Sequence, residues 1–135
     1  MIIGIGTDIL EIKRISEILR KHDKKFIKRI YGSNEISVIK NKKNNLEHYL
    51  SKRFAAKEAT WKAFNPIRGK GLIFREIETL NDKNGKPYLF FSGKTDRCIK
   101  EREKELGGTL KFDVSLSDEQ RYVIAFVVIS LAPFV

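Results

Sequence analysis

The chain opens on an apolar run, residues 2–9, that predicts a short strand containing Gly4 and Gly6. Glycine inside a strand indicates that another backbone or a ligand comes close to it. From Glu11 to residue 30, isoleucine and leucine recur at helical spacing, with lysine and arginine on the opposite face. This pattern predicts an amphipathic helix that is interrupted near His22 and Asp23.

The middle of the chain predicts one more helix and a hairpin. The helix covers residues 46–64, because Pro66 disfavours helical geometry in the residue before it. A basic loop, residues 67–71, follows. Residues 72–80 and 87–91 are then expected to be paired strands, connected through Asn84-Gly85, a dipeptide typical of hairpin turns.

The last third predicts a charged helix, residues 95–106, and two strands. Apolar and polar side chains alternate over residues 111–116, which is typical of a half-buried strand. Residues 122–131 are apolar on both faces, so this strand should be covered on both sides, and one cover can be another subunit. The whole pattern predicts one domain, residues 1–135, of α+β architecture, with helices packed on an antiparallel sheet.

The charge balance favours an acidic partner. The chain has 135 residues, with 27 Lys and Arg against 17 Asp and Glu, so its formal net charge is +10. A surplus of this size fits nucleic acid, a phosphate-rich ligand, an anionic membrane or an acidic protein. Much of it lies on the polar face of the first predicted helix, which could also be a solvated surface.

Cysteine content and hydropathy predict a cytoplasmic protein. Cys98 is the only cysteine, so an internal disulfide and a cysteine-rich zinc site are excluded and a reducing compartment is favoured. Asp8 interrupts the apolar N-terminus too early for a signal peptide. The longest apolar stretch, residues 122–135, is shorter than the roughly 20 residues that span a bilayer.

Asp8, Glu58 and Lys62 are the candidates for chemistry. Asp8 follows the first strand, where a helix cap or a turn residue is the simplest interpretation. Glu58 and Lys62 share one helix face, and an exposed ion pair worth about 0.3–0.5 kcal/mol would account for them. Ala55 and Ala59 on the same stripe, however, would leave space for a ligand to dock beside that pair.

Two carboxylates offer hard oxygen ligands, which suit Mg²⁺ holding phosphates rather than a transition metal. Spacing along the sequence does not place Asp8 beside Glu58, so this site is one interpretation among several. The N-terminal Gly-x-Gly lacks the third glycine of a dinucleotide motif, and Gly69-Lys70 lacks the remainder of a P-loop.

Three stretches resemble the holo-[acyl-carrier-protein] synthases, a family of small 4'-phosphopantetheinyl transferases. The first is Ile3-Gly4-Ile5-Gly6-Thr7-Asp8-Ile9-Leu10-Glu11-Ile12-Lys13-Arg14-Ile15. The second is Arg53-Phe54-Ala55-Ala56-Lys57-Glu58-Ala59 followed by Lys62-Ala63-Phe64, and the third is the hairpin Asn81-Asp82-Lys83-Asn84-Gly85-Lys86-Pro87. They occur in the family's order and cover nearly the whole chain, which makes the resemblance specific.

The resemblance implies a trimer of the 4'-phosphopantetheinyl transferase fold with active sites at subunit interfaces. Mg²⁺ would bridge Asp8, Glu58 and the pyrophosphate of coenzyme A; a serine of an acyl carrier protein would attack the β-phosphorus, and 3',5'-ADP would leave. Lys62 would stabilise the charge on the leaving phosphate or help to relay the serine's proton. The residues implied to bind coenzyme A are Arg53, Lys62, Gly71, Lys86, Pro87 and Ser117.

Acyl carrier proteins are strongly acidic, so the resemblance assigns the basic first helix to the carrier rather than to nucleic acid or a membrane. The residues implied to bind the carrier are Arg14, Lys21, Lys25, Lys28 and Arg29. A non-catalytic basic module that binds nucleic acid is the alternative function.

The chain departs from the family pattern at two places. Many members read Ser-x-Ser-His where this chain has Ser115-Leu116-Ser117-Asp118-Glu119, so no histidine base is assigned there. A water held by Mg²⁺ or by Glu58 is then the expected proton acceptor. Residues 65–71 differ from the family's usual Gly-Thr-Gly-Ile, so the contacts of this loop with coenzyme A do not carry over.

Overall fold

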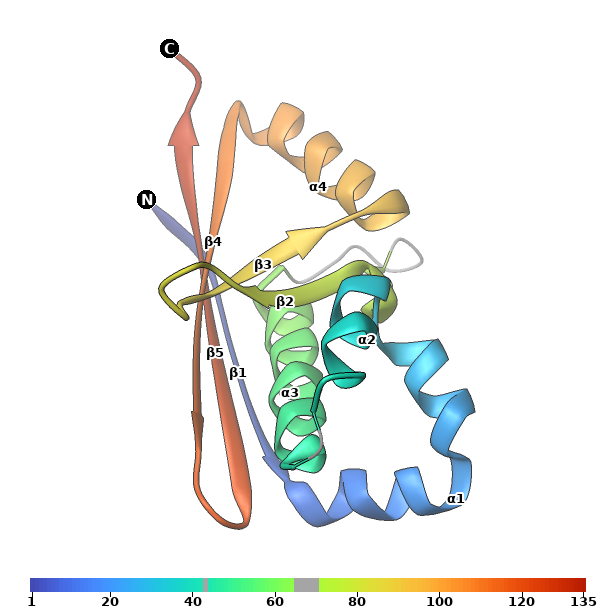
Figure 1. Cartoon of the computed structure of the whole chain (residues 1–135). Helices are drawn as coiled ribbons and strands as arrows, with labels where there is room; N and C mark the ends of the chain where they lie inside the picture. Colours follow the sequence, from blue (N-terminus) through green and yellow to red (C-terminus); the bar gives the residue numbers. More distant parts are fainter. Residues whose placement is uncertain (43, 65–70) are drawn as a thin grey trace.

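A three-stranded antiparallel sheet and four helices make up most of the computed structural model, which describes residues 1–42, 44–64 and 71–135 (Figure 1). The elements in chain order are β1 (Ile2–Glu11), α1 (Ile12–Ile30), α2 (Ser33–Ile39), α3 (Leu46–Phe64), the 3₁₀ turn η1 (Phe74–Glu76), β2 (Ile77–Asn81), β3 (Pro87–Phe91), α4 (Gly93–Leu106), β4 (Gly108–Asp118) and β5 (Tyr122–Pro133).

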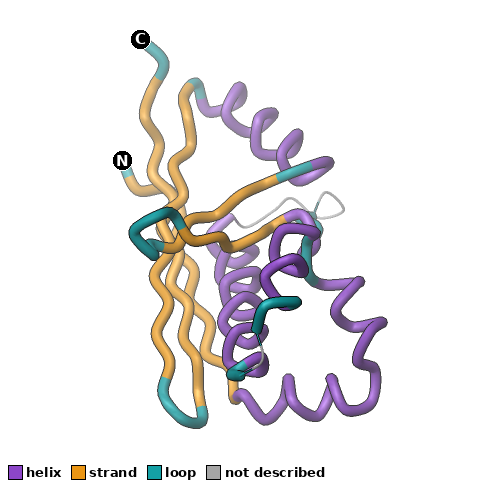
Figure 2. The backbone as a smooth tube through the Cα atoms, in the orientation of Figure 1, coloured by secondary structure: helices purple, strands orange, loops and turns teal. Residues whose placement is uncertain are grey.

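The main sheet has the order β1-β5-β4, and β2 and β3 form a separate antiparallel hairpin. Figure 2 shows the helices of the described chain on one side of the main sheet, with the hairpin starting on that side and its turn projecting past the sheet. The predicted α+β architecture with an antiparallel sheet is therefore confirmed. None of the helices in the described part of the chain is both long and apolar enough to cross a bilayer.

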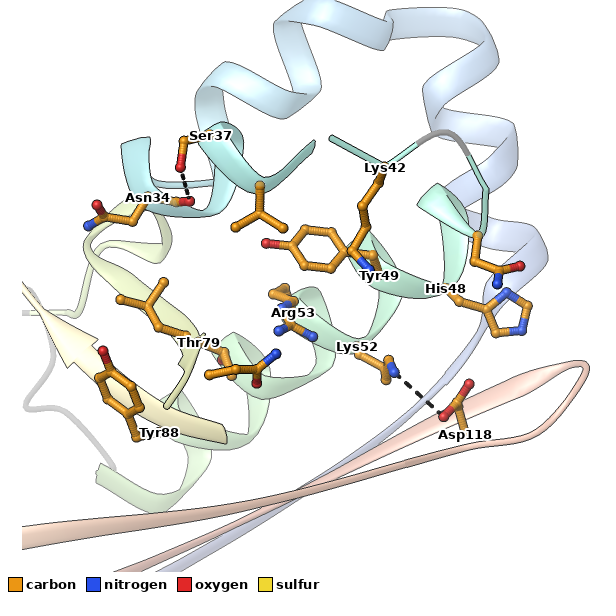
Figure 3. Close-up of a pocket in the computed structure, with 14 residues that line it drawn as sticks. Asn34, Ser37, Lys42, His48, Tyr49, Lys52, Arg53, Thr79, Tyr88 and Asp118 are labelled. Atoms are coloured by element: carbon orange, nitrogen blue, oxygen red, sulfur yellow. Dashed lines mark hydrogen bonds and ion pairs between the residues drawn. The ribbon is translucent and has the colours of Figure 1, made fainter. Parts of the chain in front are cut away.

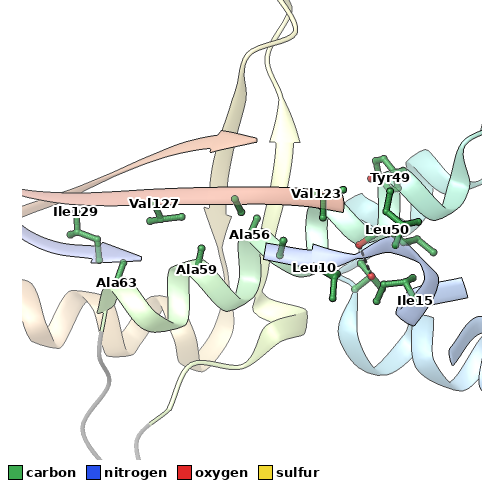
Figure 4. Close-up of a cluster of buried hydrophobic side chains, with 14 of the residues drawn as sticks. Leu10, Ile15, Tyr49, Leu50, Ala56, Ala59, Ala63, Val123, Val127 and Ile129 are labelled. Atoms are coloured by element: carbon green, nitrogen blue, oxygen red, sulfur yellow. Dashed lines mark hydrogen bonds between the residues drawn. The ribbon is translucent and has the colours of Figure 1, made fainter. Parts of the chain in front are cut away.

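Helix α3 packs directly on β1 because both surfaces are made of small residues. A Cβ at Gly4 or Gly6 would overlap the backbone carbonyls of Ala63 and Ala59, respectively. The two glycines thus allow the close backbone approach that the sequence predicted. Ala55 and Ala59 are both fully buried in the core, and Figure 4 shows Ala59 beside the main sheet. The prediction that these alanines leave room for a ligand is therefore wrong.

Strand β5 is covered on one face only within this protomer. Val123, Ala125 and Val127 face α3 and are fully buried, whereas Ile124 and Phe126 on the other face are 43% and 41% exposed. The expectation that both faces are covered therefore fails for the protomer alone. Neighbouring Ile5 and Ile9 of β1 are exposed as well, so the uncovered face of the sheet is apolar over two strands.

Helix α1 bends at the position that the sequence indicated. His22 has non-helical backbone angles, φ −138° and ψ 27°, and the two halves of α1 run in different directions (Figure 1). The hairpin turn is confirmed by Gly85, whose φ of 83° lies in the left-handed region. Gly107, with φ 73°, ends α4 as expected.

Two local predictions differ from the structure. Strand β2 begins at Ile77 rather than at residue 72, because the preceding segment turns to bond with α3 and α4 through Phe74 and Glu76. Helix α2 was not predicted; its seven residues are held by a buried carboxylate, Glu35, rather than by a long amphipathic pattern. Residues 67–70 of the predicted basic loop, together with residues 65 and 66 before it, lie outside the described residues.

Candidate active site

Asp8 lies on the face of β1 that meets α3, where the ammonium of Lys62 reaches it. Lys62 Nζ donates to Asp8 Oδ1 at 3.3 Å and to the Thr7 carbonyl at 3.0 Å. The residue that caps α1 is Glu11, so Asp8 is not the helix cap that the simplest interpretation suggested. Lys62 forms its ion pair with Asp8 of β1, and not with a residue of its own helix.

Glu58 lies close enough to Asp8 for the two charges to interact. Burial raises the pKa of Glu58, the negative charge of Asp8 raises it further, and the positive charges of Lys62 and Arg14 act in the opposite direction. Packing of β1 on α3 has therefore brought Asp8, Glu58 and Lys62 into one cluster, called the carboxylate cluster below. Sequence spacing could not show this proximity.

The carboxylate cluster has the chemistry of a magnesium site completed by a ligand. Mg²⁺ is commonly bound through one or two carboxylates, with substrate phosphates and water filling its remaining positions. Asp8 and Glu58 supply two such carboxylates. Within the described residues, no group of three or more His, Cys, Asp or Glu side chains could hold a metal by itself. The donor set therefore fits Mg²⁺ that is shared with a phosphate ligand.

The five candidate carrier-binding residues are all exposed on α1. Arg14 lies in the first turn, and its charge acts on Glu58, so it borders the carboxylate cluster. The kink at His22 then divides the rest of the set. Lys21 precedes the kink, whereas Lys25, Lys28 and Arg29 belong to the second half of the helix.

Arg53 lies in a different place, in a groove of about 760 Å³ between α2, α3 and the β2–β3 hairpin (Figure 3). Its guanidinium carbon is 4.3 Å from the centre of the Tyr49 ring, and only 5% of the residue is exposed. Arg53 Nε and Thr79 Oγ1 are buried and find no hydrogen-bond partner among the described residues. Lys42, His48 and Lys52 also line the groove, so its polar lining is rich in cationic and basic side chains.

The remaining residues implied to bind coenzyme A divide between these regions. Gly71 packs on the ring of Trp61, immediately before Lys62 in the chain, where a Cβ would overlap the indole. Lys86 and Pro87 lie at the end of the hairpin, and Pro87 pairs with Asn81, which lines the groove. Ser117 is exposed on the edge strand β4, where it pairs with Ile124 of the central strand β5.

The metal candidates and Arg53 point to different sides of α3. Helical residues are about 100° apart, so Arg53 and Glu58 project roughly 140° from one another. One protomer therefore does not gather all of the candidate residues into a single site.

A buried ion pair beneath the groove was missed at the sequence level. Lys57 and Glu35 are both fully buried, and Lys57 Nζ donates to Glu35 Oε1 at 2.7 Å, to the Phe74 carbonyl at 2.9 Å and to the Ile77 carbonyl at 2.5 Å. Glu35 also accepts hydrogen bonds from the amides of Gly32 and Thr79. Burial lowers the pKa of Lys57 and raises that of Glu35, while each charge opposes the shift of the other.

This pair fixes the rotation of α3 against α2 and β2, and Glu58 is the next residue of that helix. In the sequence, this ion pair is indicated only by the presence of Lys57 in the second motif. A motif does not indicate whether its charged residues are buried.

Comparison with known proteins agrees with this geometry. Residues 4–127 match the model of the 4'-phosphopantetheinyl transferase superfamily. A holo-[acyl-carrier-protein] synthase of Wolbachia sp. is 44% identical over 131 residues, covering 96% of this chain and 98% of the relative.

Two solved structures extend the comparison. The holo-[acyl-carrier-protein] synthase of Neisseria meningitidis has a TM-score of 0.82 at 38% identity, covering 96% of this chain and 99% of that one. The synthase of Bacillus anthracis, in complex with CoA (3',5'-ADP), has a TM-score of 0.74 at 35% identity, covering 98% and 99%. The resemblance of the three motifs is thus confirmed, and the chain belongs to the holo-[acyl-carrier-protein] synthases of the 4'-phosphopantetheinyl transferase superfamily.

Proposed function

We propose that this protein transfers the 4'-phosphopantetheine group from coenzyme A to a serine of apo acyl carrier protein. The serine oxygen attacks the β-phosphorus, the bond from that phosphorus to the bridging oxygen breaks, and the electron pair leaves with 3',5'-ADP. The observation that carries this function is the meeting of Asp8, Glu58 and Lys62 in a chain of this family. The comparisons give no support to the alternative of a basic nucleic-acid-binding module.

Asp8 and Glu58 are the proposed ligands of Mg²⁺. When bound, the ion neutralises charge on the phosphates and favours departure of the leaving group. The support is the closeness of the two carboxylates: the charge of Asp8 raises the pKa of Glu58, and a divalent cation would relieve that repulsion.

Lys62 and Glu58 have separate roles in this proposal. The side chain of Lys62 is 52% exposed, so its ammonium can move to a phosphate oxygen and stabilise the leaving group. Glu58 holds the water that accepts the serine's proton. The residues at the position of the frequent family histidine are engaged elsewhere: Asp118 pairs with Lys52 at 3.7 Å, and Glu119 accepts hydrogen bonds within the β4–β5 turn.

Coenzyme A is proposed to bind between two protomers of a trimer. Lys62 and Gly71 would come from one protomer, and Arg53, Lys86, Pro87 and Ser117 would complete the site from the adjacent one. The different directions of Arg53 and Glu58 on α3 support this arrangement. The apolar outer face of β1 and β5 supports assembly, because exposed apolar patches of this kind mark interaction surfaces.

The carrier is proposed to dock on the exposed basic residues of α1. An acidic surface complements a helix that carries Arg14, Lys21, Lys25, Lys28 and Arg29. We place the reaction in the cytoplasm, in line with one cysteine and no internal disulfide. We propose that residues 1–135 form one transferase domain.

The test is a reconstitution. Purified protein is mixed with apo acyl carrier protein, coenzyme A and Mg²⁺, and the carrier is followed by mass spectrometry. A mass gain of one phosphopantetheine that requires coenzyme A supports the function. A carrier that another synthase modifies but this protein leaves unchanged contradicts it.

A further inference from the structure

The ion pair between Lys62 and Asp8 connects two residues that the proposed reaction uses for different purposes. Lys62 Nζ lies 3.3 Å from Asp8 Oδ1, and its second contact is the neighbouring carbonyl of Thr7. The side chain of Asp8 is only 16% exposed and projects from a strand, so its position is fixed. The Lys62 side chain is flexible and more than half exposed.

An ammonium and a metal ion compete for the same carboxylate. Both bind to the oxygen lone pairs of Asp8, and the positive charge of the Lys62 ammonium would also repel a divalent ion bound there. We propose that Lys62 is a built-in competitor of the metal at Asp8, and that the pyrophosphate of coenzyme A relieves this competition by drawing the ammonium to itself. This inference rests on the proposed function, in which Asp8 is a metal ligand.

The position of Lys62 beside both carboxylates supports this arrangement. Lys62 follows Glu58 by about one turn of α3, and its ammonium contacts Asp8. Lys62 therefore compensates part of the negative charge that attracts a metal to the cluster. Arg14 adds positive charge near the same cluster, but within the described part of the chain the ion-pair partner of Asp8 is Lys62, which makes Arg14 a useful comparison.

In this arrangement the affinity for the metal depends on whether coenzyme A is bound. The metal should bind weakly to the protein alone and more tightly once coenzyme A has removed Lys62 from Asp8. Because coupling between two ligands is reciprocal, the metal must strengthen coenzyme A binding by the same factor. The same movement brings the ammonium to the phosphates, where the reaction needs it.

The experiment measures Mn²⁺ binding to the intact protein, without coenzyme A, from the electron paramagnetic resonance signal of the free ion. Lys62→Met removes the charge and keeps the length of the side chain. Loss of an exposed ion pair changes a binding constant by up to about fivefold. Removing the repulsion between the Lys62 ammonium and the divalent ion adds to this change. The expected result is a Kd for Mn²⁺ about three- to tenfold lower in Lys62→Met than in the wild type.

Lys100→Met is the matched control, because Lys100 is also an exposed lysine that pairs with a largely buried carboxylate, Glu103 at 3.6 Å, but it lies on α4. Its Kd for Mn²⁺ should stay within twofold of the wild type. Arg14→Met separates direct competition from the general field. If it lowers the Kd as much as Lys62→Met does, direct competition is overturned.

The coupling is measured by repeating the titration with saturating coenzyme A. For each protein, the Kd for Mn²⁺ without coenzyme A is divided by the Kd with coenzyme A. This ratio should be smaller in Lys62→Met than in the wild type, by about the same factor by which the substitution lowers the Kd without coenzyme A. Fluorescence of Trp61, the only tryptophan and the neighbour of Lys62, gives the reverse titration of coenzyme A with and without Mn²⁺.

An unchanged or higher Kd for Mn²⁺ in Lys62→Met overturns the inference, as does an unchanged coupling. Asp8→Asn identifies which premise fails. If that change does not weaken Mn²⁺ binding, the assignment of Asp8 as a metal ligand is wrong. If it does weaken binding while Lys62→Met has no effect, only the competition is wrong.

Discussion

Removing the buried ammonium of Lys57 should destabilise the protein more than almost any other single change. Lys57→Met would leave Glu35 as a fully buried carboxylate without its cation, and the carbonyls of Phe74 and Ile77 without their donor. Breaking a buried ion pair by removing one partner costs about 3–5 kcal/mol. That is a large share of the 5–15 kcal/mol by which a typical domain is stable.

The measurement is urea denaturation at pH 7 and constant protein concentration, for Lys57→Met, Glu35→Gln and the double variant. The double variant should lose less stability than the sum of the single losses, by about 1 kcal/mol or more, because it removes the unpaired charge. Ile99→Val in α4 is a conservative control in the core and should cost about 0.5–1.5 kcal/mol. A loss below about 1 kcal/mol for Lys57→Met, or additive single losses, would refute the reasoning.

Three further predictions concern docking, acid stability and assembly. Arg14→Glu should raise KM for the carrier more than it lowers kcat, with the affinity for coenzyme A little changed and the defect reduced by salt; an equal loss for both substrates would place Arg14 in the active site instead. Burial alone would raise the pKa of Glu76, but hydrogen bonds from the α4 amides of Thr95 and Lys94 lower it overall. Glu76→Gln should therefore lower the free energy of unfolding by about 1 kcal/mol at pH 7. The denaturation midpoints of variant and wild type should converge as the pH falls below about 4, where the carboxylate becomes protonated. A difference that does not depend on pH would contradict this. Light scattering should give a trimer, and Phe126→Glu on the exposed face of β5 should shift it toward smaller species; a fully active wild-type monomer would refute the assembly.

Much of the fold could be read from local patterns, because those patterns have local causes. The break near His22, the turn at Gly85 and the end of α4 at Gly107 all depend on residues beside them. Helix α2 and the late start of β2 depend instead on Glu35, Glu76 and Lys57, whose partners are distant in sequence. A charged residue in a sequence gives no sign of whether it will be solvated or buried.

The candidate site shows the same division. The residue types of Asp8 and Glu58 suggested a metal, but their proximity depends on α3 packing against Gly4 and Gly6. Small residues can make room for a ligand or for a neighbouring element of the fold. Ala55 and Ala59 are buried in the core, so they make room for neighbouring elements. The groove around Arg53 could not be predicted, since it is built from segments of α2, α3 and the hairpin.

The most direct test of the account is the rate of holo-carrier formation, measured by mass spectrometry, for Asp8→Ala and Glu58→Ala. Both side chains serve charge neutralisation rather than the apolar core, so each variant should keep a melting temperature near that of the wild type. Each should nevertheless lose at least about 100-fold in rate, because removing one preorganised electrostatic group costs that much. Near-normal rates in both variants, with a metal chelator present, would contradict the role assigned to the carboxylate cluster.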